Sequence, residues 1–130
     1  MTLRHFFITR AHSFRHAFAG WAYVLRTQRN AWIHSLASAI VLLLAIWLRL
    51  PRQDWATLIL TICLVWTAEF INTALEAVVD LASPDHHPLA KVGKDVGAAA
   101  VLIAAIASVI IGMLILGPPL LEKLIVLFAA

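Results

Sequence analysis

Long apolar runs separated by short polar breaks dominate the chain. The first uncharged run covers residues 30–48 and ends at the segment "RLPRQD", whose proline cannot continue a helix. A second helix is expected over residues 55–81, and a third over residues 96–117, where the run reaches a Gly-Pro-Pro sequence. Each run is close to or above the roughly 20 residues that an α-helix needs to cross a bilayer. The pattern therefore predicts three membrane-spanning helices.

Residues 11–28, upstream of the first run, have a different pattern. Apolar side chains recur at steps of four, three and four residues, and arginine and histidine side chains lie off this stripe. The pattern predicts an amphipathic helix that lies on the membrane surface, packs on the helical bundle, or does both. The stripe consists of Phe14, Phe18, Trp21 and Leu25.

The composition indicates a membrane protein with one domain. The chain has 130 residues, 62% of them hydrophobic, and a mean hydropathy of +0.90. Ordinary soluble domains contain roughly 45–50% apolar residues. We therefore expect one integral-membrane domain over residues 1–130, without a secretory signal peptide. The net charge of +3 comes with no nucleic-acid-binding motif, so a nucleic acid is not an expected partner.

Basic residues predict the orientation of the spans. Five arginines precede the first span, and Lys91 and Lys94 lie between the second and third spans. Because lysine and arginine are enriched in cytoplasmic segments, we expect both of these segments to be cytoplasmic. The short connection that contains Arg49 and Arg52 then faces the other side of the membrane, although it is also basic.

A stripe of carboxyl groups runs along the second span. On an α-helix, Glu69, Glu76 and Asp80 lie within about 40° of one another, and Asn72 lies about 60° from Glu69. Glu69 is expected roughly 9 Å below the cytoplasmic edge of the hydrocarbon core, with Glu76 and Asp80 at that edge. A carboxylate in the core costs at least ~2.5–3.5 kcal/mol, which favours a functional role. The alternative is that Glu69 and Asn72 only form hydrogen bonds between helices.

The segment after this stripe adds basic groups and histidines. We expect "SPDHHPLAKVGKDVG", residues 83–97, to form a loop where Glu76 and Asp80 reach the membrane surface. Carboxylates bind Mg²⁺, lysines offset phosphate charge, and a deeper carboxylate can accept a proton from a lipid hydroxyl. The combination suits phosphoryl transfer. A soluble P-loop kinase is excluded, because Asp95 stands where a Walker A motif requires Ser or Thr.

These motifs resemble those of the small bacterial integral-membrane lipid kinases, which comprise diacylglycerol kinase and undecaprenol kinase. The resemblance rests on "ExxNTAxExxVD" at residues 69–80, "HHPLAKxxKD" at residues 86–95 and "RNAWIH" at residues 29–34, and it covers about residues 14–118. It implies three transmembrane helices and a surface helix, assembled as a homotrimer in the bacterial inner membrane. Active sites would lie between subunits, with ATP entering from the cytoplasm and the lipid from the bilayer.

The resemblance also implies roles for individual residues. Glu69 looks like the catalytic base that takes the lipid hydroxyl proton, and Glu76 like a Mg²⁺ ligand. The family usually has a second metal-binding glutamate before Arg-Asn, but Gln28 occupies this place. Its amide oxygen can coordinate Mg²⁺ but adds no negative charge. The residues similar to those of the family's nucleotide site are Asn72, Glu76, Asp80, Asp85, His86, His87, Lys94 and Asp95.

The lipid and two other classes of function stay open. The "HHPLAK" motif looks more like the undecaprenol kinase branch, but no residue distinguishes diacylglycerol from undecaprenol as the substrate. A small proton-coupled transporter would explain Glu69, although it would leave Glu76 and Lys94 without a role. A catalytically weak scaffold derived from the kinase would be consistent with Gln28.

Overall fold

The computed structural model describes the backbone of residues 3–83, 85 and 87–129, and the side chains of these residues from His12 onward. The described part of the chain is all helical. Three of its helices are long and apolar enough to cross a membrane, which confirms an all-α fold with three membrane-spanning candidates. The helices are α1 (Leu3–Thr27), α2 (Arg29–Leu48), α3 (Arg52–Ala82) and α4 (Pro88–Phe128).

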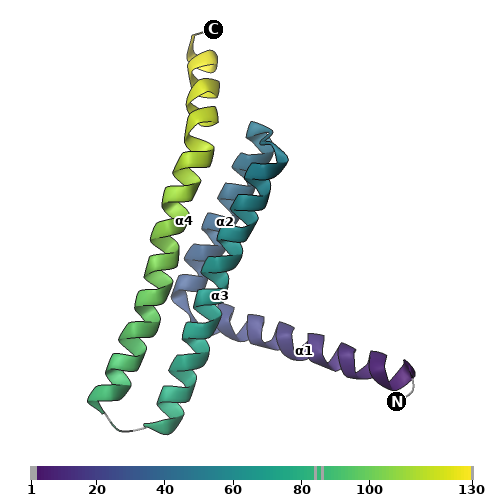
Figure 1. Ribbon diagram of the computed structural model, residues 1–130, viewed down its shortest axis with the longest axis vertical. Helices are drawn as coiled ribbons and strands as arrows, with labels where there is room; N and C mark the ends of the chain where they lie inside the picture. The colour runs from purple at the N-terminus through teal and green to yellow at the C-terminus, as the bar shows by residue number, and fades with distance from the viewer. Residues whose placement is uncertain (1–2, 84, 86, 130) are drawn as a thin grey trace.

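The helices α2, α3 and α4 lie side by side as a bundle, and α1 leaves this bundle at a steep angle (Figure 1). Helix α4 packs mainly along α3 and also contacts α2. The α3–α4 connection lies at one end of the bundle, and the α2–α3 connection lies at the other end. The acidic end of α3 and the basic start of α4 are therefore neighbours in space.

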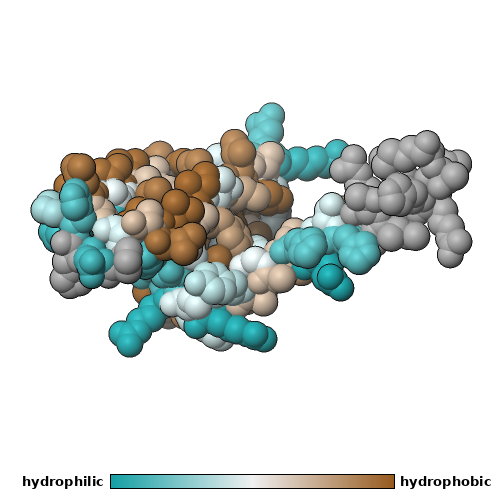
Figure 2. Space-filling view, turned by 90° about the horizontal axis from the view of Figure 1, so that it is seen from below, coloured by the Kyte–Doolittle hydropathy of each residue, from teal (hydrophilic) through white to brown (hydrophobic). Residues whose placement is uncertain are grey.

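The outside of the bundle is apolar, as expected for a surface that faces lipid. Figure 2 shows hydrophobic side chains over the bundle and many hydrophilic ones on α1. Side chains such as Leu60 and Met113 are 71% and 69% exposed, respectively. Continuous apolar exposure of this kind is unusual for a soluble monomer. Two small core clusters hold the helices together: Val24, Ala31 and Trp66 join α1, α2 and α3, and Ala45, Leu58 and Leu116 join α2, α3 and α4.

A tight turn joins α2 to α3. Arg49 adopts a left-handed conformation with φ of 54°, and its N–H group donates to the carbonyl groups of Ala45 and Ile46. The N–H group of Leu50 also donates to Ala45 O, at 3.2 Å. These bonds satisfy carbonyl groups that the helix end would otherwise leave unpaired. Pro51 then caps α3 in an extended conformation, so the chain reverses within a few residues.

Helix α4 begins earlier than the sequence predicted. The expectation of a loop through residues 83–97 and a helix from residue 96 is wrong, because α4 starts at Pro88 and carries both Lys94 and Asp95. The Nδ1 atom of His87 accepts a hydrogen bond from the N–H group of Leu89 at 3.2 Å. Proline at the first helical position needs no hydrogen-bond acceptor, so this local sequence favours a helix start at Pro88.

Helix α4 also ends later than predicted, at Phe128 and not at Gly117. Both Pro118 and Pro119 lie inside the helix, where each one removes a backbone donor. Packing on both sides of the prolines accounts for the continuation. Leu116 is buried against α2 and α3. Beyond the prolines, Lys123 Nζ donates to Trp47 O at 2.6 Å and lies 4.3 Å from the centroid of the Trp47 ring.

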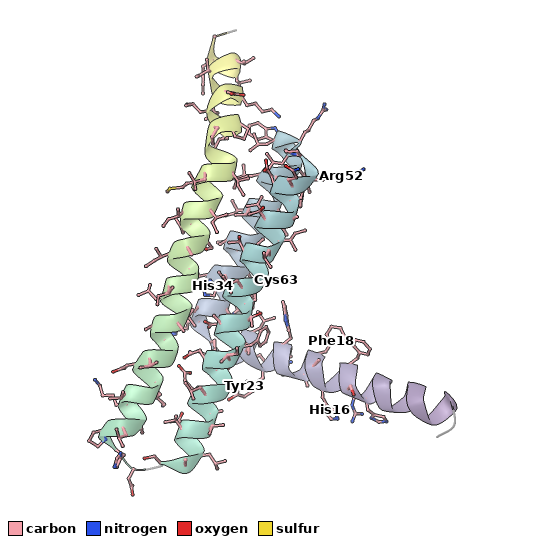
Figure 3. The ribbon with its side chains drawn as sticks, viewed as in Figure 1. His16, Phe18, Tyr23, His34, Arg52 and Cys63 are labelled. Carbon is pink, nitrogen blue, oxygen red and sulfur yellow. The ribbon has the colours of Figure 1, made fainter. Side chains whose placement is uncertain are left out.

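Among the side chains that the structure describes, from His12 onward, helix α1 contacts the bundle near its C-terminal end. Val24 is buried there, and the Trp21 ring stacks on the Trp66 ring with 4.8 Å between centroids. Farther out, Phe14 and Phe18 are 66% and 71% exposed. Figure 3 shows Phe18 and His16 on opposite sides of this helix. One part of the predicted apolar stripe therefore contacts the bundle, and the rest faces outward.

Candidate functional site

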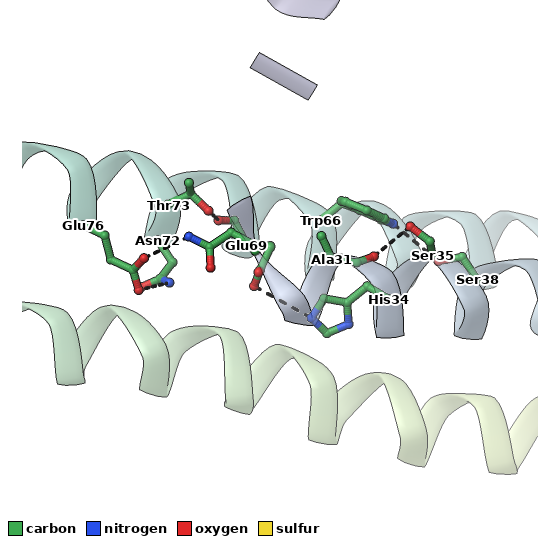
Figure 4. Close-up of polar contacts among 10 residues, drawn as sticks. Ala31, His34, Ser35, Ser38, Trp66, Glu69, Asn72, Thr73 and Glu76 are labelled. Carbon is green, nitrogen blue, oxygen red and sulfur yellow. Dashed lines mark hydrogen bonds and ion pairs between the residues drawn. The ribbon is translucent and has the colours of Figure 1, made fainter. Parts of the chain in front are cut away.

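The carboxyl group of Glu69 lies in the interior of the bundle. Glu69 is 1% exposed, and its Oε2 atom has no hydrogen-bond partner among the described residues. Figure 4 shows that the carboxyl group points from α3 toward His34 on α2. The distance from Glu69 Oε2 to His34 Nε2 is 3.8 Å. Since a buried carboxylate without partners is costly, this side chain needs a functional or structural reason for its position.

A second polar group surrounds Glu76, two helical turns from Glu69. Asn72 Nδ2 donates to Glu76 Oε1 at 3.0 Å, and Gln28 Nε2 donates to Glu76 Oε2 at 3.0 Å. Gln28 reaches this place because it is the N-cap of α2, at the break between α1 and α2. Neutral amide groups thus orient both carboxylate oxygens. Among the described residues, no lysine, arginine or histidine forms an ion pair with Glu76.

The Asn72–Glu76–Gln28 group suits a magnesium ion. Mg²⁺ prefers oxygen ligands and is usually held by one or two carboxylates together with substrate phosphates. Glu76 supplies a carboxylate, Gln28 has an amide oxygen, and Asn72 Oδ1 is buried without a hydrogen-bond partner among the described residues. No cluster of three or more His, Cys, Asp or Glu ligands occurs in the described part of the chain. These donors therefore fit an ion that is shared with phosphate groups.

A cavity, which we call the outer cavity, lies where α3 ends and α4 begins. Its volume is about 550 Å³, within the roughly 300–1,000 Å³ typical of small-molecule sites. Lys94 Nζ and Asp80 Oδ1 form an ion pair across the two helices at 2.5 Å. The polar side chains that line this outer cavity are Asp80, Ser83, Asp85, His87, Lys91 and Lys94.

The structure does not bring every predicted site residue into these groups. Asp95 is 65% exposed, and its Oδ2 atom accepts a hydrogen bond from Lys91 Nζ at 3.3 Å on the same helix. It does not line the outer cavity. His86, which was also predicted to lie near a nucleotide, falls outside the described residues.

The close approach of α3 and α4 depends on Gly97. Gly97 is buried, and a Cβ atom at this position would clash with Asn72 Oδ1 and lie 3.1 Å from the Leu75 side chain. Glycine thus lets the α4 backbone pass directly over the Asn72 amide. The sequence alone does not reveal which polar side chain Gly97 faces.

His34 is a candidate site residue to which the sequence motifs gave no role. Its Nε2 atom comes within 3.8 Å of Glu69 Oε2 because α2 and α3 pack together. A signal exists in the sequence: Asn30, His34 and Ser38 recur every four residues in a largely apolar helix, so they share one face. The partner of that face cannot be read from the spacing alone.

Comparisons with known proteins identify the family. The family model for prokaryotic diacylglycerol kinase matches residues 15–116. The chain is 49% identical over 114 residues to a diacylglycerol kinase of Synechocystis, covering 87% of this chain and 65% of that protein's length. It is 42% identical over 108 residues to an undecaprenol kinase of Bacillus subtilis, covering 83% of this chain and 88% of that protein.

A third relative is a diacylglycerol kinase of Escherichia coli, 40% identical over 89 residues, which cover 63% of this chain and 73% of that protein. The family match includes both the Glu69–His34 pair and the Asn72–Glu76–Gln28 group. The chain belongs to the prokaryotic diacylglycerol kinase family.

Proposed function

We propose that this protein is an ATP-dependent lipid kinase of the bacterial cytoplasmic membrane. It transfers the γ-phosphoryl group of ATP to the hydroxyl group of a membrane lipid. The family relation supports this activity. The observation that carries the proposal is the buried Glu69 carboxyl group in a membrane-spanning candidate helix, whose Oε2 atom has no hydrogen-bond partner among the described residues and which lies two helical turns from Glu76.

In this proposal, Glu69 is the general base. A hydroxyl group at the level of the lipid headgroups needs a proton acceptor near that level, and the position of Glu69 along the second span supports such a depth. Phosphoryl transfer needs little covalent participation by the protein, so positioning and electrostatics account for most of the rate enhancement. The bundle holds Glu69 away from bulk water, with its carboxyl group directed at His34.

Glu76, Asn72 and Gln28 would hold Mg²⁺ together with the phosphate groups of ATP. Bound Mg²⁺ offsets the negative charge of the phosphoryl group that is transferred. The nucleotide occupies the outer cavity, where Lys94 faces its phosphates and Asp80 orients the Lys94 ammonium group. The remaining proposed nucleotide-binding residues are Asp85, His86, His87 and Asp95.

The lipid is diacylglycerol or undecaprenol. Relatives with both names match this chain, at 49% and 42% identity, and this difference is too small to choose between the two substrates. We further propose that the cytoplasmic face carries the N-terminus and the site, because arginines and lysines concentrate there.

A proton-coupled transporter is the alternative from another functional class. It would use the buried Glu69 as a proton carrier. It gives no role to the oxygen ligands around Glu76 or to the outer cavity, and the family relation does not support it. Among these functions, only a kinase uses both polar groups and the cavity.

Phosphate transfer to defined lipids tests the proposed function. The purified protein in nanodiscs is incubated with Mg²⁺ and ATP labelled at the γ-phosphate, with diacylglycerol or undecaprenol in parallel samples. We expect label in at least one lipid, and none when the lipid is omitted or Mg²⁺ is removed by a chelator. A folded protein that labels neither lipid would refute the kinase activity.

A further inference from the structure

Two polar atoms face each other inside the bundle without hydrogen-bond partners. Glu69 Oε2 and His34 Nε2 are both buried and unsatisfied within the described part of the chain. Their separation of 3.8 Å exceeds the roughly 2.7–3.2 Å of a hydrogen bond between nitrogen and oxygen. Together they leave a place where a single proton can be accepted and shared.

The imidazole ring of His34 is held in this position by aromatic packing. The Trp66 ring meets the His34 ring edge-on, with 6.3 Å between centroids. Trp66 is itself fixed, because its Nε1 atom donates to Ser38 Oγ at 3.4 Å and its face stacks on Trp21. The His34 ring therefore packs against Trp66, and its Nε2 atom faces the Glu69 carboxyl group.

The side chains of His34 and Glu69 differ in their exposed fraction. Glu69 is 1% exposed, whereas the His34 side chain is 14% exposed and lines a cavity of about 270 Å³ together with Gln28, Asn72 and Glu76. Glu76 is the only acidic or basic residue besides His34 among the described residues lining this cavity, and α4 contributes only apolar side chains. Glu69 is therefore enclosed, whereas His34, at 3.8 Å from it, borders the cavity.

We propose that His34 and Glu69 act as one proton-accepting pair, in which His34 positions the Glu69 carboxylate and shares the proton that Glu69 receives. This inference rests on the proposed kinase function. The O–H bond of the lipid hydroxyl breaks, and its oxygen forms the new bond to the γ-phosphorus. The bond from that phosphorus to the bridging oxygen breaks, and its electron pair leaves with ADP. The proton lies between Glu69 Oε2 and His34 Nε2, and it passes to water in the cavity when the products leave.

The substitution His34→Ala tests the proposed role through its kinetics. We expect kcat for lipid phosphorylation to fall by about 100-fold, because general acid–base groups contribute roughly 10²–10⁴-fold. The KM values for lipid and for MgATP should change by no more than about twofold, because His34 acts on the proton and not on binding. The matched control is Ser35→Ala, which removes only a hydroxyl that donates to Ala31 O on the same helix.

Chemical rescue separates proton acceptance from packing. Added imidazole should restore kcat of His34→Ala in proportion to its concentration, because the substitution opens space beside the cavity. Pyrazole has the same ring size but is a much weaker base, so it should not restore activity. The second variant is His34→Gln, which keeps a polar side chain but cannot take up a proton, and we expect it to be as slow as His34→Ala.

Four outcomes would overturn the inference. They are kcat of His34→Ala within about threefold of the wild type, equal rescue by both azoles, a full rate for His34→Gln, and a loss that appears only in KM. A wild-type protein that phosphorylates neither lipid would refute the kinase function and this inference together. An active wild type with an equally active His34→Ala variant would refute the inference alone.

Discussion

Gln28 places a neutral amide group beside Glu76. Gln28 donates to Glu76 Oε2 at 3.0 Å and thereby takes the place of the second glutamate that the family resemblance implies. An amide oxygen can coordinate Mg²⁺, but a second carboxylate would attract the ion more strongly because it adds a negative charge. In the present arrangement, the neutral Gln28 amide avoids the repulsion that a second carboxylate beside Glu76 would cause.

Gln28→Glu is therefore expected to strengthen metal binding. The Mg²⁺ concentration that gives half of the maximal phosphorylation rate should fall by about threefold or more, since one charge near a divalent ion contributes on the order of 1 kcal/mol even in high dielectric. The measurement is a Mg²⁺ titration of the initial rate at saturating ATP. An unchanged Mg²⁺ requirement would show that Gln28 does not contribute to the metal site.

The spacing of polar residues predicted which residues of α3 share one face, but it did not predict which residues elsewhere in the chain contact them. The stripe that contains Glu69 and Glu76 follows from positions on one helix. The contacts with His34 and Gln28 join residues of α2 to residues far along the chain. A one-helix pattern contains no information about which neighbouring helix face packs against it. This is why the resemblance placed Gln28 near metal but left His34 without a role.

At the scale of helices, the packing of α4 on α3 fixes the Asn72 amide. Gly97 is the contact point, because any side chain there meets the Asn72 side chain. Gly112, farther along α4, has no atom within 4 Å of the position that a Cβ would take. The two glycines therefore have different tolerance for the same substitution.

The expected result for Gly97→Ala is a displaced Asn72 and a strained α3–α4 contact. Overpacking of this kind costs about 1–3 kcal/mol. We expect a lower midpoint of thermal unfolding, together with a raised Mg²⁺ requirement. The control, Gly112→Ala, should leave both quantities unchanged. Equal behaviour of the two variants would show that the Gly97 contact with Asn72 has no effect on the site.

The length of α4 shows the limit of sequence signals for helix ends. Gly117, Pro118 and Pro119 predicted a stop, but the helix continues to Phe128. Local propensity was overridden by packing, because Leu116 and Lys123 contact α2 on either side of the prolines. Three helices were predictable because long apolar runs are unambiguous, whereas the ends depend on contacts that the runs do not encode.

Trp21 anchors α1 to the bundle, so its removal should free this helix. Its ring lies 4.8 Å from the Trp66 centroid and 5.3 Å from the Phe70 centroid, and aromatic pairs contribute about 0.5–1.5 kcal/mol beyond burial. In Trp21→Ala we expect faster trypsin cleavage after Arg15 and Arg26. Trp32→Ala is the control, because Trp32 is 67% exposed on α2. Unchanged cleavage in Trp21→Ala would mean that other contacts hold α1.

At the scale of the whole molecule, a single chain leaves polar side chains exposed in a cavity between its candidate membrane-spanning helices. The cavity beside His34 and Glu76 is bordered by one face of α4 and has no cover from a fifth helix in the described part of the chain. Unsatisfied polar groups at this depth cost several kcal/mol each if lipid covers them. A second copy of the chain could cover them at lower cost, as expected if active sites lie between subunits.

The uncovered polar groups favour an oligomer, and because the family resemblance implies a homotrimer, we predict that a homotrimer is the active form. The protein should have the mass of three chains in mild detergent and in nanodiscs, by light scattering or native mass spectrometry. Activity should be lost in parallel with the trimer when harsher detergent dissociates it. A strictly monomeric sample with full lipid kinase activity would contradict a site formed between subunits.

Glu69→Gln tests the central claim most directly, because it removes the base and keeps the size of the side chain. We predict a loss of kcat of about 1,000-fold, within the roughly 10²–10⁴-fold range of general bases. The oligomer mass and the KM for MgATP should stay close to those of the wild type. Glu122→Gln, at an exposed position near the end of α4, is the matched control and should retain full activity. If Glu69→Gln phosphorylates lipid at more than a third of the wild-type rate, Glu69 is not the base and the proposed mechanism is wrong.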